Sequence, residues 1–189
     1  GLTERLTPET ADHYYDVMAE KLGQDDFRPR ALFERFNIEV ITTTESPLDT
    51  LGHHRTIRQS GWKGRVLTAY RPDPVLDPDY EGFRDNLVKL GQITGEDALT
   101  WEGYLAALKN RREFFAAMGA TSTDHGHPTA FTADLGSGEA KALFDKIVSG
   151  RFAPADAELF RGQMLTEMAR MSVEDGLVMQ LHPGSFRNH

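Results

Sequence analysis

Apolar positions along the chain follow two spacings, and each spacing predicts a different element. Four short segments rich in apolar or β-branched residues predict strands. They cover Phe36–Thr44, Arg65–Tyr70, Ala120–His125 and Leu177–His182. Elsewhere apolar side chains recur every three or four residues, as on one face of a helix. This spacing predicts helices over Thr7–Leu22, Arg30–Phe36, Leu48–Gln59, Asp79–Gly91, Thr100–Met118, Gly138–Val148 and Pro154–Val173.

The order of these elements predicts an α/β fold with a parallel sheet, because every pair of successive strands is separated by a helix. Right-handed connections and a sequential strand order would place all helices on one side, so that the other side becomes a barrel interior. A closed barrel of this kind needs eight strands and typically about 250 residues. We therefore expect part of a (β/α)8 TIM-like barrel, either a fragment or a half-barrel that pairs with another chain.

The predicted domain organisation is that residues 1–189 form the central segment of a single (β/α)8 barrel domain. Helical insertions are expected at about residues 74–118 and about 137–173. Gly1 stands where an initiator Met would be expected, which favours a central segment of a longer protein.

Composition narrows the possible partners and chemistry. The chain has 21 Lys and Arg against 29 Asp and Glu, a formal net charge of -8, so nucleic acid and anionic membranes are poor partners. No apolar run approaches the roughly 20 residues that span a bilayer, and no secretory signal is present, so we expect a cytoplasmic protein. The absence of cysteine excludes disulfides and thiolate ligands. Any metal would have to use His and carboxylate side chains.

Polar residues follow every predicted strand, and the carboxyl ends of parallel strands are where such sheets bind ligands. The expected pocket brings Arg71, His125 and His182 to a common rim. Glu45 and Ser46 follow the first strand, but a helix-start pattern explains them better, with Ser46 as N-cap and Pro47 at the first helical position. The sequence Arg71-Pro72-Asp73-Pro74 is read as a turn that stops the second strand.

Two of these motifs leave alternatives open. Arg71 offers a two-pronged donor for a carboxylate or phosphate, but it could instead form a salt bridge with Asp73. His125 and His127 have the spacing of a zinc pair, which would need a third ligand such as Asp124 or His182. The run from His53 to Arg55 lies within a predicted helix and is interpreted as a solvated or packed surface.

Four segments together resemble the uronate isomerase family of the amidohydrolase superfamily. They are Arg35-Phe36-Asn37-Ile38-Glu39-Val40-Ile41-Thr42-Thr43-Thr44, Ala69-Tyr70-Arg71-Pro72-Asp73, Ser122-Thr123-Asp124-His125-Gly126 and Gln180-Leu181-His182-Pro183-Gly184-Ser185-Phe186-Arg187-Asn188-His189. The resemblance extends over essentially the whole chain but covers only the middle of a family member. It implies a distorted (β/α)8 barrel that interconverts D-glucuronate with D-fructuronate and D-galacturonate with D-tagaturonate.

The resemblance also implies roles for single residues. Arg71 would bind the substrate carboxylate, and His182 and Arg187 would line the site, with Asp124 and His125 as further lining residues. The family's divalent metal, zinc, is held by an HxH pair and an Asp on barrel strands that lie outside this chain. The His125–His127 triplet occupies the place of a later strand, so no metal ligand is assigned here.

The catalytic base is also expected on other strands, so the isolated chain is expected to be inactive. We expect the complete enzyme to form a homo-oligomer. Two alternatives are a metal-dependent hydrolase of esters or amides on the same fold, and a half-barrel that binds sugar acids without turnover.

Overall fold

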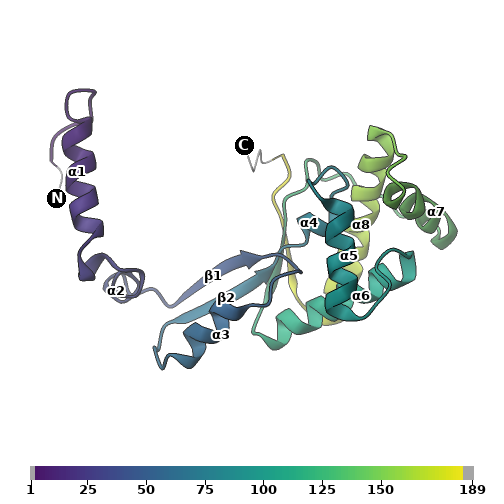
Figure 1. Ribbon diagram of the computed structural model, residues 1–189, viewed down its shortest axis with the longest axis horizontal. Coiled ribbons are helices and arrows are strands. Elements are labelled where there is room, and N and C mark those ends of the chain that lie inside the picture. Colours follow the sequence, from purple (N-terminus) through teal and green to yellow (C-terminus); the bar gives the residue numbers. More distant parts are fainter. Residues whose placement is uncertain (1–2, 185–189) are drawn as a thin grey trace.

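The computed structural model describes residues 3–184 and shows a four-stranded parallel sheet with helices packed on it (Figure 1). The strands are β1 (Val40–Glu45), β2 (Arg65–Tyr70), β3 (Ser122–His125) and β4 (Val178–Leu181), in the spatial order β1-β2-β3-β4. The helices are α1 (Ala11–Leu22), α2 (Pro29–Arg35), α3 (Gly52–Gln59), α4 (Asp73–Leu76), α5 (Phe83–Thr94), α6 (Trp101–Ala117), α7 (Ser137–Val148) and α8 (Pro154–Asp175), with a 3-10 turn η1 (Asp25–Phe27). The predicted α/β class, the four strands and their sequential parallel order are confirmed.

The strand register decides which side chains share a face of the sheet. Tyr70 of β2 is in register with Thr123 of β3, so these two side chains point to the same face. His125 lies two residues after Thr123 and also points there, whereas Asp124 between them points to the opposite face. We call the face that carries Tyr70, Thr123 and His125 the helix face, and the face that carries Asp124 the open face.

The helix face carries the core. Tyr70 meets Phe115 of α6 edge to face, with ring centroids 5.2 Å apart. Tyr104 of α6 stacks on Phe144 of α7 at 4.8 Å, and its hydroxyl donates to the carbonyl oxygen of Val75 at 2.7 Å. The crossover helices therefore pack on one side of the sheet and join one another there.

The open face is uncovered within residues 3–184. Val40 at its β1 end is 41% exposed, and Val178 at its β4 end is 65% exposed. Within this described part of the chain, no strand pairs with the outer edge of β1 or of β4. The side chains of this face are mostly polar, and they include Thr42, Thr44, Ser122 and Asp124. The inner face of a barrel that binds a ligand near its strand ends carries polar residues of this kind.

The N-terminal arm stands apart from the sheet (Figure 1). Helix α1 buries none of its residues, and the apolar stripe predicted from the sequence is exposed at Tyr15, Met18 and Leu22. Helix α2 is attached by Phe33, whose ring meets that of Trp62 at 4.9 Å.

Several boundaries differ from the sequence predictions. Helix α1 begins at Ala11 and not at Thr7, and α5 covers Phe83–Thr94 and not Asp79–Gly91. Strand β1 begins at Val40 and not at Phe36, since Asn37 adopts a left-handed backbone with φ 49° that ends α2. Helix α8 continues to Asp175, two residues beyond its expected end. The predicted turn after β2 is wrong from Asp73 onward, because residues 73–76 form the short helix α4 with Pro74 in its first turn.

The predicted start of α3 is also wrong. The helix begins at Gly52, and Ser46 and Pro47 lie in a turn before it. Arg111 of α6 donates to the carbonyl oxygens of Pro47 at 2.7 Å and of Asp49 at 2.9 Å. These carbonyls are thereby held by another helix, and the chain enters α3 only afterwards.

Candidate functional site

Four charged or titratable side chains gather where β2, β3 and β4 end: Arg71, Asp73, Asp124 and His182. Arg71 Nε donates to Asp73 Oδ2 at 2.9 Å, and Arg71 Nη1 lies 3.9 Å from Asp124 Oδ2. His182 Nε2 lies 3.1 Å from Asp124 Oδ1. Three successive strands thus deliver one connected cluster, which we call the rim cluster.

The sheet itself positions two members of this cluster. The backbone amide of Arg71 donates to the carbonyl oxygen of Glu45 at 2.9 Å, which continues the β1–β2 hydrogen bonding by one residue. The amide of His182 donates to the carbonyl oxygen of His125 at 2.9 Å in the same way. Because Arg71 follows Tyr70 and His182 follows Leu181, both side chains turn to the open face beside Asp124.

The rim cluster is partly shielded from solvent. The side chains of Asp124, Asp73 and Arg71 are 10%, 16% and 24% exposed, whereas that of His182 is 44% exposed. Attraction between charges is stronger in such surroundings than in bulk water. The salt bridge between Arg71 and Asp73 that the sequence left as an alternative is present and is made by Nε, whereas Nη1 lies 3.9 Å from Asp124 Oδ2, beyond hydrogen-bond distance. A guanidinium held in this way can still donate to an incoming carboxylate.

His125 lies at the same carboxyl edge of the sheet as His182, whose amide donates to its carbonyl oxygen, but the His125 side chain does not join the rim cluster. Its side chain points to the helix face and is fully buried, with Nε2 2.9 Å from Thr123 Oγ1. Burial, followed by the nearby charges of His127 and Arg112, lowers the pKa of His125 to about 3. The ring is therefore neutral at physiological pH. Arg187 lies outside the described residues, so its lining role stays a prediction.

His127 is the second histidine of the triplet and is also buried, at 5% exposure. Burial lowers its pKa, although the carboxylates of Asp73 and Asp77 act in the opposite direction. The two imidazole centroids of His125 and His127 are 5.9 Å apart. Across residues 3–184, no group of three His, Asp or Glu side chains is placed to hold a metal ion. Within this range the chain therefore offers no complete set of three ligands.

Glu45 forms a second polar cluster that sequence reasoning missed, because a helix cap seemed to explain it. Its carboxylate accepts a hydrogen bond from Thr68 Oγ1 and lies 3.7 Å from His54 Nε2. The same His54 nitrogen is 3.0 Å from Thr43 Oγ1. The cluster joins β1, β2 and α3. The alternation of polar Thr43 and Glu45 along β1, two residues apart, was the available signal.

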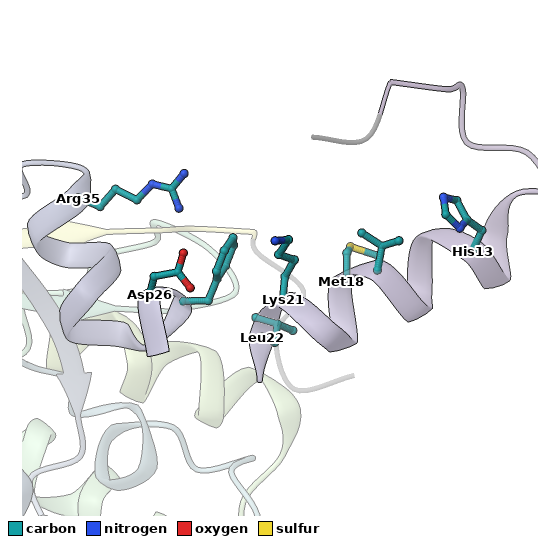
Figure 2. A pocket seen from close by; sticks show the side chains of 8 residues that line it. His13, Met18, Lys21, Leu22, Asp26 and Arg35 are labelled. Carbon is teal, nitrogen blue, oxygen red and sulfur yellow. The ribbon is translucent and has the colours of Figure 1, made fainter. Parts of the chain in front are cut away.

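A hollow of about 670 Å³ lies elsewhere, between α1 and the segment of η1 and α2. Figure 2 shows its side chains spread along the groove, from His13 on α1 to Asp26 and Arg35 across from it. Its polar groups do not converge on one point, in contrast to the rim cluster.

Within residues 3–184, no helix has the length and apolar character needed to cross a membrane.

Comparison with known proteins gives a consistent result. A family model described as glucuronate isomerase matches residues 1–189. Uronate isomerase from Xanthomonas campestris pv. campestris (strain B100) is 68% identical over 185 residues, which are 98% of this chain and 39% of that protein. The uronate isomerase of Phenylobacterium zucineum (strain HLK1) is 64% identical over all of this chain and 39% of its own length.

Two solved structures share the fold. Glucuronate isomerase from Caulobacter crescentus superposes with a TM-score of 0.91 at 55% identity, over 100% of this chain and 40% of that one. Uronate isomerase from Thermotoga maritima superposes with a TM-score of 0.84 at 28% identity, over 95% of this chain and 40% of that one. The chain thus spans about two fifths of the length of the relatives that it matches.

Proposed function

Because the chain belongs to the glucuronate isomerase family, we propose that it supplies the substrate-anchoring segment of an enzyme that interconverts aldose and ketose hexuronates. The substrates would be D-glucuronate and D-galacturonate, and the products D-fructuronate and D-tagaturonate. The observation that carries this proposal is the position of Arg71, held at the end of β2 beside Asp124 and His182. In this reading the segment forms part of a single (β/α)8 barrel domain in which residues 74–118 and 137–173 are helical insertions.

The chemistry assigns each part a task. An aldose–ketose shift moves a proton between adjacent carbons through an enediol, so it needs a base, donors for the developing oxyanion and an anchor for the distant carboxylate. Arg71 has the geometry of the anchor, because a guanidinium can grip a carboxylate with two parallel hydrogen bonds. His182, within reach of Asp124 and partly exposed, would contact the substrate together with Arg187. The base would come from other strands of the barrel.

The divalent metal associated with the family, zinc, belongs to this proposal as well. Its ligands would lie outside this chain, and His125 and His127 would not be among them, since His125 Nε2 is engaged by Thr123 and both rings are buried. We further propose that the complete enzyme belongs to the amidohydrolase superfamily and works in the cytoplasm as a homo-oligomer. The exposed apolar stripe of α1 supports an assembly of this kind.

A hybrid enzyme tests the function. Residues 1–189 would replace the matching segment of the Caulobacter crescentus enzyme, and ketose formation from D-glucuronate and D-galacturonate would be followed. We expect turnover in the hybrid and a KM for D-glucuronate at least about tenfold higher in Arg71→Lys, because an ammonium cannot form the two-pronged contact. A folded hybrid without turnover would contradict the proposed activity. An Arg71→Lys variant with the parent KM would contradict the role of Arg71.

A further inference from the structure

The carboxylate of Asp73 binds a second partner besides Arg71, in the loop after β3, and it is therefore held in one orientation. Asp73 Oδ2 accepts from Arg71 Nε at 2.9 Å, while Asp73 Oδ1 accepts from the backbone amide of Gly126 at 3.0 Å. A carboxylate held at both oxygens cannot rotate freely, and it therefore fixes the plane of the guanidinium that it binds. The end of β2 and the loop after β3 are joined by this one side chain.

The loop can approach Asp73 so closely because residue 126 has no side chain. A Cβ at Gly126 would lie 2.7 Å from Asp73 Oδ2 and 2.9 Å from Arg71 Nη2. Both distances are shorter than a carbon atom tolerates against oxygen or nitrogen. The φ angle of Gly126 lies outside the left-handed region, so the backbone alone would accept an alanine. Glycine is required at position 126 because the ion pair of Arg71 and Asp73 occupies the space that a Cβ would fill.

The atoms that would have to give way are the ends of two flexible side chains and not backbone atoms. A methyl group at position 126 would thus push the Asp73 carboxylate and the Arg71 guanidinium aside while the sheet and α4 remain. Such a shift moves the group that is placed to grip the substrate carboxylate, and a displacement of about 1 Å at an anchoring group can lower kcat/KM by up to about a hundredfold.

From these contacts we infer that Asp73 and Gly126 are positioning residues, which aim the Arg71 guanidinium at the carboxylate of the hexuronate. This inference rests on the proposed function and adds two residues to it. Neither residue needs to touch the substrate, since both act through Arg71. Asp73 supplies orientation through its two acceptor oxygens, and Gly126 supplies the space.

The test uses the hybrid enzyme with Gly126→Ala and with Asp73→Asn. Gly138→Ala is the matched control, because a Cβ at Gly138 in the first turn of α7 meets no atom within 4 Å. We expect Gly126→Ala to raise the KM for D-glucuronate at least about tenfold, with kcat within about twofold and an unchanged unfolding temperature. Asp73→Asn should do the same, because an amide has one acceptor oxygen and cannot serve both donors. Gly138→Ala should keep the parent KM.

Two results would overturn the inference. One is a KM for Gly126→Ala equal to that of Gly138→Ala. The other is a raised KM accompanied by a comparable fall in kcat and in the unfolding temperature, which would indicate a general structural defect. Crystal structures of the parent and Gly126→Ala hybrids separate this question from the proposed function. If the parent hybrid folds but has no turnover, the proposed function fails. The positioning role is then judged by whether Arg71 Nη2 and Asp73 Oδ2 have moved, and unmoved atoms would overturn it.

Discussion

At the scale of single residues, His125 makes the stability of the protein depend on pH. Burial lowers its pKa from the ordinary value of 6.5 to about 3. Between these values the unfolded chain binds a proton that the folded chain does not, so stability falls as the pH drops below 6.5. The loss is at most about 1.4 kcal/mol for each pH unit.

We expect urea unfolding of the hybrid enzyme to reveal this dependence. The free energy of unfolding should fall between pH 7.5 and pH 5.5 by more in the parent than in His125→Gln, which has no proton to take up at this position. The exposed His53 provides the control, and His53→Gln should keep the slope of the parent. Equal slopes in the parent and His125→Gln would show that this imidazole is not the source.

Two buried arginines of α6 have partners that the spacing of apolar residues does not predict. Arg111 and Arg112 are charged residues of α6 whose side chains are buried. Arg112 Nε donates to Asp175 Oδ2 at 2.6 Å, at the end of α8, and its guanidinium carbon lies 5.7 Å from the centre of the Tyr70 ring. Arg111 holds the carbonyls before α3. The hydrogen-bond partners Pro47, Asp49 and Asp175 lie more than 60 positions from these arginines. The spacing of residues along the chain gives no signal for partners so far away.

At the scale of elements, α6 and α7 both carry a glycine in the first turn, with opposite surroundings. A Cβ at Gly103 of α6 would lie 2.2 Å from the carbonyl oxygen of Asp97, which is a backbone atom. The amide of Gly103 also donates to the Thr100 side chain at 3.3 Å, which caps the helix. The loop before α6 therefore lies directly against this turn and depends on the missing side chain.

Alanine at Gly103 and alanine at Gly138 should change the free energy of unfolding in opposite directions. Gly103→Ala should destabilise the fold by about 1–3 kcal/mol, because the loop backbone has to move away. Gly138→Ala should be neutral or stabilise it by up to about 1 kcal/mol, since alanine favours a helix and meets no neighbour here. Urea unfolding of the two variants checks this. A Gly103→Ala variant as stable as Gly138→Ala would mean that the loop yields without cost.

At the scale of the whole molecule, the sheet exposes a face and two edges that a closed barrel would cover. Val40 and Val178 lie on the open face. The outer edges of β1 and β4, with which no strand pairs among residues 3–184, can recruit further strands. We expect the purified 189-residue chain to self-associate in light scattering coupled to gel filtration, and to show no turnover of D-glucuronate.

The hybrid enzyme is the control for this prediction. It supplies the remaining strands, so it should elute as one defined species under the same conditions. A monomeric 189-residue chain would contradict the proposed exposure of a barrel interior. Turnover of D-glucuronate by that chain would show that the base and the oxyanion donors lie within it.

The sequence by itself determined the elements and their order, because the spacing of apolar residues is a local property of the chain. It also placed Arg71 and His182 at strand ends, where a parallel sheet must bring them together. Only the tertiary structure decided that Asp73 holds Arg71, that Gly126 leaves room for both, and that His125 turns under the helices. These outcomes depend on register and on packing between distant segments, which the spacing of residues along the chain does not encode.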